Sequence, residues 1–369
     1  MKVVVLSALG NAVAQRCISS LLETTTAVDF DLYLVREKRF REQTLNQALL
    51  LTGTDEDVLF VGDDIEFTPG WYEALMANYD QADILGMSML YPGTTKVQDC
   101  GYDLVQIDEL ISLEAKDRGL SKGQIEPFAI RSCDALCGCF MLVKANVFAY
   151  VSSFSEEGQN RWGEFVFISQ ARQHRATVSV IDHFLYHYGK STKSNPDKLL
   201  SSTSYHIERS IWQDILHRYI DPADIRIRMY SVLEENFLAR LQDSTLRILF
   251  YGIGTVTEFI LNKVQPKEDY IAFCSGLPEE RGLDFRGQKI LSIDEVAFSE
   301  FDWVLITPLY IGEKLYHEVV LPCLPQGFKG IISIVAIETT GEERVYFCRD
   351  ISPFKGAITG IHQNHERLR

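Results

Sequence analysis

The stretch Asp57–Trp71, DVLFVGDDIEFTPGW, places two adjacent acids directly after an apolar run. Residues 58–61 are apolar throughout and therefore predict a buried strand. Beyond the acids, the triplet Thr68–Gly70 can begin a helix, with the threonine as cap and the proline at the first position. The segment raises the question of why a buried strand should end on two carboxylates, Asp63 and Asp64.

The segments around this stretch alternate between the periodicities of strands and helices. Strands are predicted over residues 3–7, 30–35, 57–61 and 82–89, and helices over residues 12–25, over residues 41–51 and from Thr68 onward. This β-α-β-α-β-α-β order predicts an α/β fold with a parallel, doubly wound sheet. Ligands of such sheets bind beyond the carboxyl ends of the strands, so we expect Asp63 and Asp64 at the ligand-binding edge.

The length of 369 residues indicates more than one domain. We assign residues 1–190 to the first α/β domain and residues 191–243, which begin with a polar serine-rich stretch, to a helical linker. A strand, a Gly-x-Gly turn and a helix follow Leu246, which predicts a smaller Rossmann-like domain over residues 244–340. Residues 341–369 lack clear periodicity and are expected to be an irregular tail.

Composition and charge narrow the classes of function. A net charge of −15 disfavours nucleic-acid binding, which needs a basic surface. No apolar run approaches the length that spans a bilayer, and the first residues lack the pattern of a signal peptide. We therefore expect a cytoplasmic protein with no transmembrane segment, whose anionic ligands are received by a metal ion or by helix N-termini.

The acid pair has three interpretations: solvated turn residues, a helix-capping cluster or a divalent-metal site. Mg²⁺ and Mn²⁺ favour oxygen ligands, and Mg²⁺ typically takes one or two carboxylates together with substrate phosphates. The order of strand, acid pair and helix start within a parallel sheet favours the metal site, although short motifs often occur by chance.

Residues 1–190 resemble GT-A glycosyltransferases of the family 2 type. The resemblance rests on LFVGDDIEFTPGWYEAL, on REQTLNQAL (Arg41–Leu49), on CDALCGCFMLVKANVF and on the stretch from Arg161 to Thr192. It implies a nucleotide-sugar donor, a glycan or glycoconjugate acceptor, Mn²⁺ or Mg²⁺ as cofactor, and transfer with inversion.

The resemblance also implies roles for individual residues. Asp64 matches the metal-binding acid, and His187 matches the histidine that completes the metal or phosphate site. Asp63 matches the acid near the donor ribose or the metal. Three further residues are expected to contact phosphate or to line the donor–acceptor cleft, and they are Arg41, Gly138 and Trp162. A solvated helix charge is the alternative for Arg41, and core packing is the alternative for Trp162.

One position departs from the pattern of the family. The family usually carries Glu-Asp where this chain has Glu164 and Phe165. Glu164 is our first candidate for the base that removes the acceptor proton, and Asp134 is the second. A weakened or lost activity is the third alternative. The acid that the family places after the second strand to contact the nucleotide is also not evident, since only Glu37 is available there.

The cysteine and histidine patterns are weaker indications of a metal site than the acid pair. Cys133, Cys137 and Cys139 form a C-x3-C-x-C pattern without the paired C-x2-C spacing of zinc sites. We interpret them as buried free thiols within a strand over residues 133–143. His183 and His187 would share a face if their segment were helical, and His183 is not expected to bind a metal.

In the C-terminal domain Gly252 and Gly254 follow a strand, but Thr257 stands where a dinucleotide fingerprint needs its third glycine. The ribose-binding acid is absent from residues 273–275. We expect this domain to serve packing or self-association.

The sequence thus predicts a metal-dependent glycosyltransferase. The alternatives are a non-catalytic scaffold that binds nucleotide sugars and an NAD-dependent sugar-modifying enzyme that uses the C-terminal domain.

Overall fold

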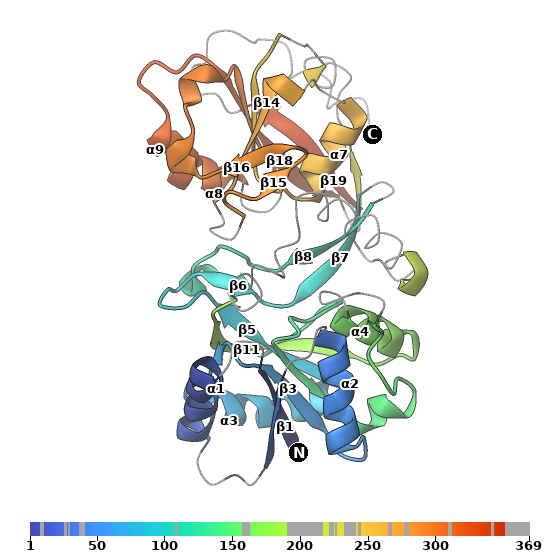
Figure 1. Cartoon of the computed structure of the whole chain (residues 1–369). Helices are drawn as coiled ribbons and strands as arrows, with labels where there is room; N and C mark the ends of the chain where they lie inside the picture. Colours follow the sequence, from blue (N-terminus) through green and yellow to red (C-terminus); the bar gives the residue numbers. More distant parts are fainter. Residues whose placement is uncertain are drawn as a thin grey trace. The chain divides into compact units, whose positions relative to one another are not determined.

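The computed structural model describes the chain except for residues 8–10, 26–27, 29, 37–40, 108–109, 157–162, 190–216, 221–224, 226, 232–240, 243–244, 265–267, 277–279, 309–311, 341–342 and 351–369 (Figure 1). The chain divides into two compact units. The first comprises Met1–Val105, Ile111–Leu200 and Ile207–Arg226, and the second Gln106–Leu110, Ser201–His206 and Ile227–Arg369. Each unit combines a sheet with helices, which confirms the predicted α/β class.

The first unit is built on a sheet with the strand order β2-β1-β3-β10-β5-β11-β4. Strands β1 and β3 are parallel, as are β5 and β11, whereas β10 runs antiparallel between β3 and β5. The predicted parallel sheet is therefore mixed. The strands are β1 (Lys2–Ser7), β2 (Asp31–Arg36), β3 (Val58–Gly62), β4 (Ile65–Glu66), β5 (Ile84–Leu90), β10 (Phe140–Val143) and β11 (Val178–His187), with β6 (Val97–Asp99) beside β5 and β9 (Ile130–Ser132) beside β11.

Helices cover both faces of this sheet, with α1 (Asn11–Thr24) and α3 (Trp71–Ala77) on one face and α2 (Arg41–Thr52) and α4 (Gly163–Gln173) on the other (Figure 1). Alternate residues of β1 enter different cores, because successive side chains of a strand point to opposite faces. Val3 and Val5 pack with α1 and α3, whereas Val4 and Leu6 pack with α2 and α4. The sheet is thereby buried on both sides.

The remaining described elements of the first unit are short. Strands β7 (Tyr102–Ile107) and β8 (Leu110–Ala115) are neighbours. Single-turn helices lie at Tyr79–Gln81, Lys122–Gln124 and Ala145–Ala149. Most of the predicted helical linker over residues 191–243 lies outside the described residues.

Helix α3 begins later than predicted. Its N-cap is Gly70, at a φ of 86°, and not Thr68. The Thr68 hydroxyl instead donates to the carbonyl oxygen of Phe184 at 2.8 Å and lies 2.8 Å from Nε2 of His183. Thr68 therefore joins the start of the helix to β11, a tertiary contact that outweighs its local capping preference.

The segment Cys133–Val143 is not one strand, as was predicted. Only Phe140–Val143 forms β10, while residues 133–139 are turns and irregular backbone. His183 and His187 lie on β11 and not on a helix. Because β10 runs antiparallel to β3, residues 137–139 lead into β10 next to the end of β3.

The second unit has the strand order β15-β16-β14-β13-β17-β18-β19-β12. Within it β16, β14, β13, β17 and β18 are mutually parallel with the first strand in the middle, which is the doubly wound order. The strands are β12 (Ile227–Ser231), β13 (Ile248–Tyr251), β14 (Ile271–Cys274), β15 (Asp284–Phe285), β16 (Gln288–Leu291), β17 (Trp303–Ile306), β18 (Ile331–Thr340) and β19 (Glu343–Asp350).

The helices of the second unit are α7 (Thr255–Val264), α8 (Gly312–Leu315) and α9 (Leu321–Cys323), with a π-helical turn at Tyr316–Val320 and single-turn helices at Glu268–Tyr270, Ile293–Glu295 and Phe298–Glu300. Within the described residues, each helix of the chain is too short or too polar to serve as a membrane span.

Two strands of this unit lie where other structure was predicted. β19 falls in the tail that was expected to be irregular, and β12 falls in the segment that was expected to be helical. β19 pairs antiparallel with β18 and parallel with β12. β12 depends on its pairing with β19, a strand far away in the sequence, whereas β19 also pairs with β18, the strand just before it.

We predict that Trp71→Ala lowers the free energy of unfolding by about 3–5 kcal/mol, the usual range for a buried tryptophan. The Trp71 side chain is fully buried, and its Nε1–H donates to the Thr25 hydroxyl at 2.8 Å. Met76 lies on the same helix but is 45% exposed, so Met76→Ala is the matched control and should change stability by less than about 0.5 kcal/mol. Urea unfolding followed by circular dichroism checks both values, and equal losses would contradict this assignment of the helix faces.

Candidate active site

Asp63 and Asp64 lie at the carboxyl end of β3, where the sequence placed them. Both side chains are buried, with 2% and 5% exposed. The backbone N–H of Asp63 donates to the carbonyl oxygen of Leu6 at 3.1 Å, and the carbonyl oxygen of Asp64 accepts from the N–H of Tyr188 at 3.0 Å. Backbone hydrogen bonds on both sides therefore hold the acid pair at the edge of the sheet.

Asp64 faces His187, which is the last residue of β11. Asp64 Oδ2 lies 3.5 Å from His187 Nε2, and the backbone of His187 pairs with that of Ile65 in β4. Burial favours a raised pKa for Asp64, but the hydrogen bond and charge of His187 outweigh burial and lower this pKa below its ordinary value. The structure thus brings together two residues, 123 positions apart, that the sequence assigned to one metal or phosphate site.

Two thiols lie beside this acid–histidine pair. Cys137 and Cys139 belong to the turn before β10, and their sulfur atoms are 2.9 Å apart. A ligand atom of each thiol and of His187 lies within 4.8 Å of the other two. The hydrogen bond from Cys139 lowers the pKa of Cys137, whereas burial raises the pKa of Cys139. Sequence reasoning had set both thiols aside, although their C-x-C spacing around a glycine was a usable signal.

A second charged pair contacts the same turn. The Arg41 Nε–H donates to Glu164 Oε1, and Arg41 Nη2 donates to the carbonyl oxygen of Gly138 at 2.8 Å. A Cβ placed on Gly138 would lie 2.3 Å from Glu164 Oε1, so the carboxylate packs directly against the backbone of this glycine. Arg41, Gly138 and Glu164, three residues singled out from the sequence, are therefore in contact.

The second candidate base, Asp134, has partners that anchor other elements. Its Oδ1 lies 2.8 Å from Arg172 of α4, and its Oδ2 accepts from the N–H of Leu104 in β7 at 2.8 Å. Phe165, which stands at the position of the usual family acid, is buried in an apolar cluster that includes Leu104. This geometry favours a structural role for Asp134 and for Phe165.

Glu42 was not singled out from the sequence, but it is fully buried next to the start of α4. Its Oε1 accepts from the N–H of Gly163 at 3.2 Å, and a Cβ on Gly163 would meet Glu42 Cγ at 2.1 Å. This contact positions the first turn of α4 and hence Glu164. Trp162 and Glu37 lie outside the described residues.

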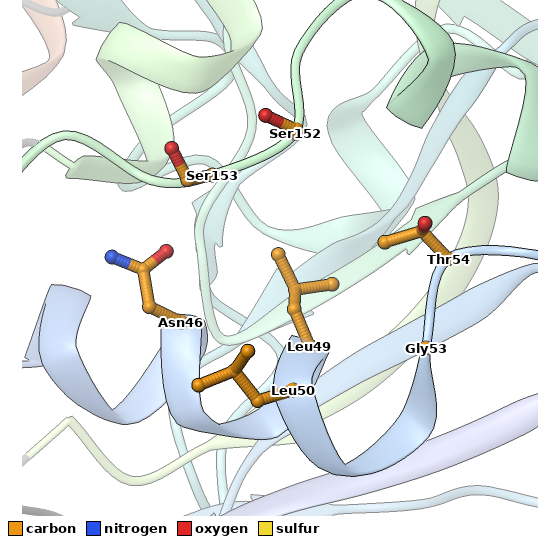
Figure 2. A pocket seen from close by; sticks show the side chains of 7 residues that line it. All are labelled: Asn46, Leu49, Leu50, Gly53, Thr54, Ser152 and Ser153. Carbon is orange, nitrogen blue, oxygen red and sulfur yellow. The ribbon is translucent and has the colours of Figure 1, made fainter.

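A surface hollow of about 520 Å³ lies elsewhere on the first unit (Figure 2). Its lining comes from the end of α2 and from residues of the facing loop, namely Asn46, Leu49, Leu50, Gly53, Thr54, Ser152 and Ser153. Helix α2 begins at Arg41, beside Glu164, and ends at Thr52, beside this hollow. The hollow therefore does not coincide with the acid edge.

In the second unit, Thr257 fills the space under the glycine turn. Its hydroxyl donates to the carbonyl oxygen of Gly252 at 2.7 Å and lies 2.7 Å from the hydroxyl of Thr307. Thr257 is fully buried, as is expected of a packing residue. That this unit binds no dinucleotide stays a prediction.

Comparison of the chain with protein-family models gives no match, and comparison with curated proteins gives none either. Among solved structures, the chain is similar to GalNAc-T7 with UDP, GalNAc and Mn²⁺, at 11% identity and a TM-score of 0.40 over 59% of this chain and 54% of that one. It is also similar to S. aureus TarS 1–349 in complex with UDP-GlcNAc, at 15% identity and a TM-score of 0.40 over 61% and 70%. A third match, A197 from STIV, has 13% identity and a TM-score of 0.34 over 52% and 88%. We draw nothing about function from likenesses at this level.

We predict that Gly138→Ala destabilises the protein by about 1–3 kcal/mol, because the added methyl group would displace the Glu164 carboxylate. Gly123→Ala is the matched control, since a Cβ there meets no atom within 4 Å. Chemical unfolding of both variants checks this prediction, and an unchanged Gly138→Ala variant would contradict the close packing at this turn.

We further predict a high titration midpoint for His187 in the metal-free protein. Burial alone would lower the pKa of His187, but Cys137, Asp64 and Asp99 outweigh burial and raise this pKa to about 9. His183 is the internal control, because burial lowers its pKa below 6.5. An NMR titration should give a higher midpoint for the His187 ring than for the His183 ring. Asp64→Asn should lower the midpoint of His187.

The raised pKa of His187 makes the free energy of unfolding depend on pH. Because the folded pKa lies above the ordinary value of 6.5, the contribution of His187 to the free energy of unfolding is complete below pH 6.5. It is lost as the pH rises through about 9. A His187 midpoint at or below that of His183 would contradict the pairing with Asp64.

Proposed function

We propose that the first unit is a glycosyltransferase that moves a sugar from a nucleotide-sugar donor to a hydroxyl group of a glycan or glycoconjugate, with inversion. The observation that carries this proposal is the pairing of Asp64 with His187 at the carboxyl edge of the sheet, 3.5 Å apart. Ligands of doubly wound sheets bind at this edge. The motifs that resemble GT-A enzymes converge on the same place.

The acid–histidine pair would hold a divalent cation. Asp64 offers a carboxylate oxygen, which suits Mn²⁺ and Mg²⁺, and His187 offers a nitrogen, which is foreign to the all-oxygen sites that Mg²⁺ prefers. Of the two ions expected from the sequence, this pair suits Mn²⁺ better. A cation bound there would neutralise the leaving diphosphate as a Lewis acid. Asp63 stays the candidate for the contact with the donor ribose.

The other groups of the site would act on the acceptor side. Glu164 is the proposed base, which removes the proton of the acceptor hydroxyl as the new bond forms. Arg41 holds one oxygen of Glu164 and so orients the carboxylate. The carbonyl oxygen of Gly138 accepts from Arg41, and a side chain at this glycine would collide with Glu164. A non-catalytic scaffold that binds the donor is the competing function, because Phe165 replaces the usual acid.

We predict that UDP, GDP or dTDP binds the protein in the presence of Mn²⁺. Binding should weaken at least about tenfold when EDTA removes the cation or when Asp64→Ala removes a proposed ligand, because loss of even a residue that supports a metal ligand costs about 10–100-fold in metal affinity. Isothermal titration calorimetry on protein first stripped of metal checks this expectation. Asp80→Asn is the control, because Asp80 is an exposed acid of the same unit.

Metal-dependent nucleotide binding without donor hydrolysis or transfer would favour the scaffold. If no nucleotide binds to the folded protein under any of these conditions, the transferase proposal is wrong.

A further inference from the structure

The thiols beside His187 give this site a donor set that the acid pair alone does not have. Cys137 Sγ, Cys139 Sγ and a ring nitrogen of His187 lie within 4.8 Å of one another. Asp64 Oδ2 lies 3.5 Å from His187 Nε2. Two sulfur atoms and one nitrogen therefore converge, with the Asp64 carboxylate beside the histidine, and sulfur with nitrogen is the ligand chemistry of zinc and related thiophilic metals and not that of Mg²⁺.

Backbone hydrogen bonds between strands fix these groups in place. The N–H of Gly62 donates to the carbonyl oxygen of Cys139 at 2.8 Å, which ties the cysteine turn to the end of β3. A Cβ on Gly62 would lie 2.9 Å from Asp64 Oδ1 and 3.6 Å from Cys139 Cβ, so the carboxylate and this cysteine flank the same glycine. His187 is fixed by its pairing with Ile65. The site is preorganised by the fold.

A neighbouring side chain orients the histidine ring. Gln98 Oε1, which can only accept a hydrogen bond, lies 3.0 Å from His187 Nδ1. Nδ1 therefore carries the hydrogen, and Nε2 is the atom that faces Asp64. Histidines that bind metals are commonly held in this way by an acceptor on the other ring nitrogen.

Two of the distances in the site can be compared with those of a tetrahedral zinc site. Zinc–nitrogen and zinc–oxygen bonds of about 2.0–2.2 Å place two such ligand atoms about 3.3–3.6 Å apart. The Nε2–Oδ2 distance of 3.5 Å falls in this range. The two sulfur atoms, now 2.9 Å apart, would separate to about 3.8 Å, as zinc–sulfur bonds of about 2.3 Å require.

We propose that Cys137, Cys139 and His187 bind a thiophilic divalent metal, with Zn²⁺ as the expected ion and with Asp64, 3.5 Å from the histidine, as the candidate for a fourth ligand. This inference concerns the cation of the site and needs neither a bound nucleotide nor transfer activity. Asp64 and His187 are the groups assigned above to the donor cation, so Zn²⁺ and Mn²⁺ would compete for the same position.

The test is a titration of the reduced, metal-stripped full chain with Co²⁺ under nitrogen. We expect an ultraviolet thiolate-to-cobalt charge-transfer band and intense visible bands typical of tetrahedral Co²⁺, both abolished by added Zn²⁺. The charge-transfer band should weaken in Cys137→Ser and in Cys139→Ser and vanish in the double variant. Each single variant should bind Co²⁺ at least about tenfold more weakly, and so should Gln98→Ala, since loss of an orienting partner costs 10–100-fold.

Cys133→Ser is the matched control, because Cys133 is the third cysteine of the same sequence pattern and packs against Gly101 instead. It should bind Co²⁺ like the wild type. Alkylation of the wild-type protein gives a readout that needs no variant, since bound Zn²⁺ should protect Cys137 and Cys139 from the reagent. Circular dichroism checks that each variant is folded.

Co²⁺ binding without a charge-transfer band, or alkylation of both thiols unchanged by Zn²⁺, would overturn the proposal. These outcomes are independent of nucleotide calorimetry, so the zinc site and the transferase function can fail separately.

Discussion

The direction of β10 is the constraint on which the site depends. This strand runs antiparallel between β3 and β5, with Phe140 opposite Val61. Because it begins where β3 ends, the residues just before it must lie at the carboxyl edge of the sheet. That edge carries Asp63 and Asp64. A parallel strand in the same place would have brought its other end there, and Cys137, Gly138 and Cys139 would lie far from the acids.

Three buried carboxylates of the first unit have charged partners. Asp64 faces His187, Glu164 binds Arg41, and Asp134 binds Arg172. An unpaired buried charge is strongly destabilising, so these pairs limit where each element can pack. The third pair joins the cysteine segment to α4 and serves architecture, whereas the first two are in reach of the turn at Gly138. Glu164 is therefore the better candidate for the base, and Asp134 has a structural role. Residue type alone does not distinguish them, since both are carboxylic acids.

Two groups of side chains meet at the turn of residues 137–139. The thiols of Cys137 and Cys139 lie close to the imidazole of His187, with the carboxylate of Asp64 beside the imidazole. Glu164 and Arg41 form a polar pair against the backbone of Gly138. In the proposed transferase the first group would hold the cation for the leaving diphosphate, and the second would supply the base for the incoming hydroxyl. The thiols are the feature that distinguishes this site from one built of oxygen ligands alone.

Local periodicity in the sequence determined the α/β class, the early strands and helices, and the position of the acids at the end of β3. The resemblance of its motifs to those of GT-A enzymes singled out Asp64, His187, Arg41, Gly138 and Glu164, which the structure places in contact as two groups. Tertiary structure alone decided the direction of β10, the strand β12, and the meeting of the thiols with His187. Those features depend on hydrogen bonds and packing between segments far apart in the chain, and the residues of one segment do not identify its distant partner.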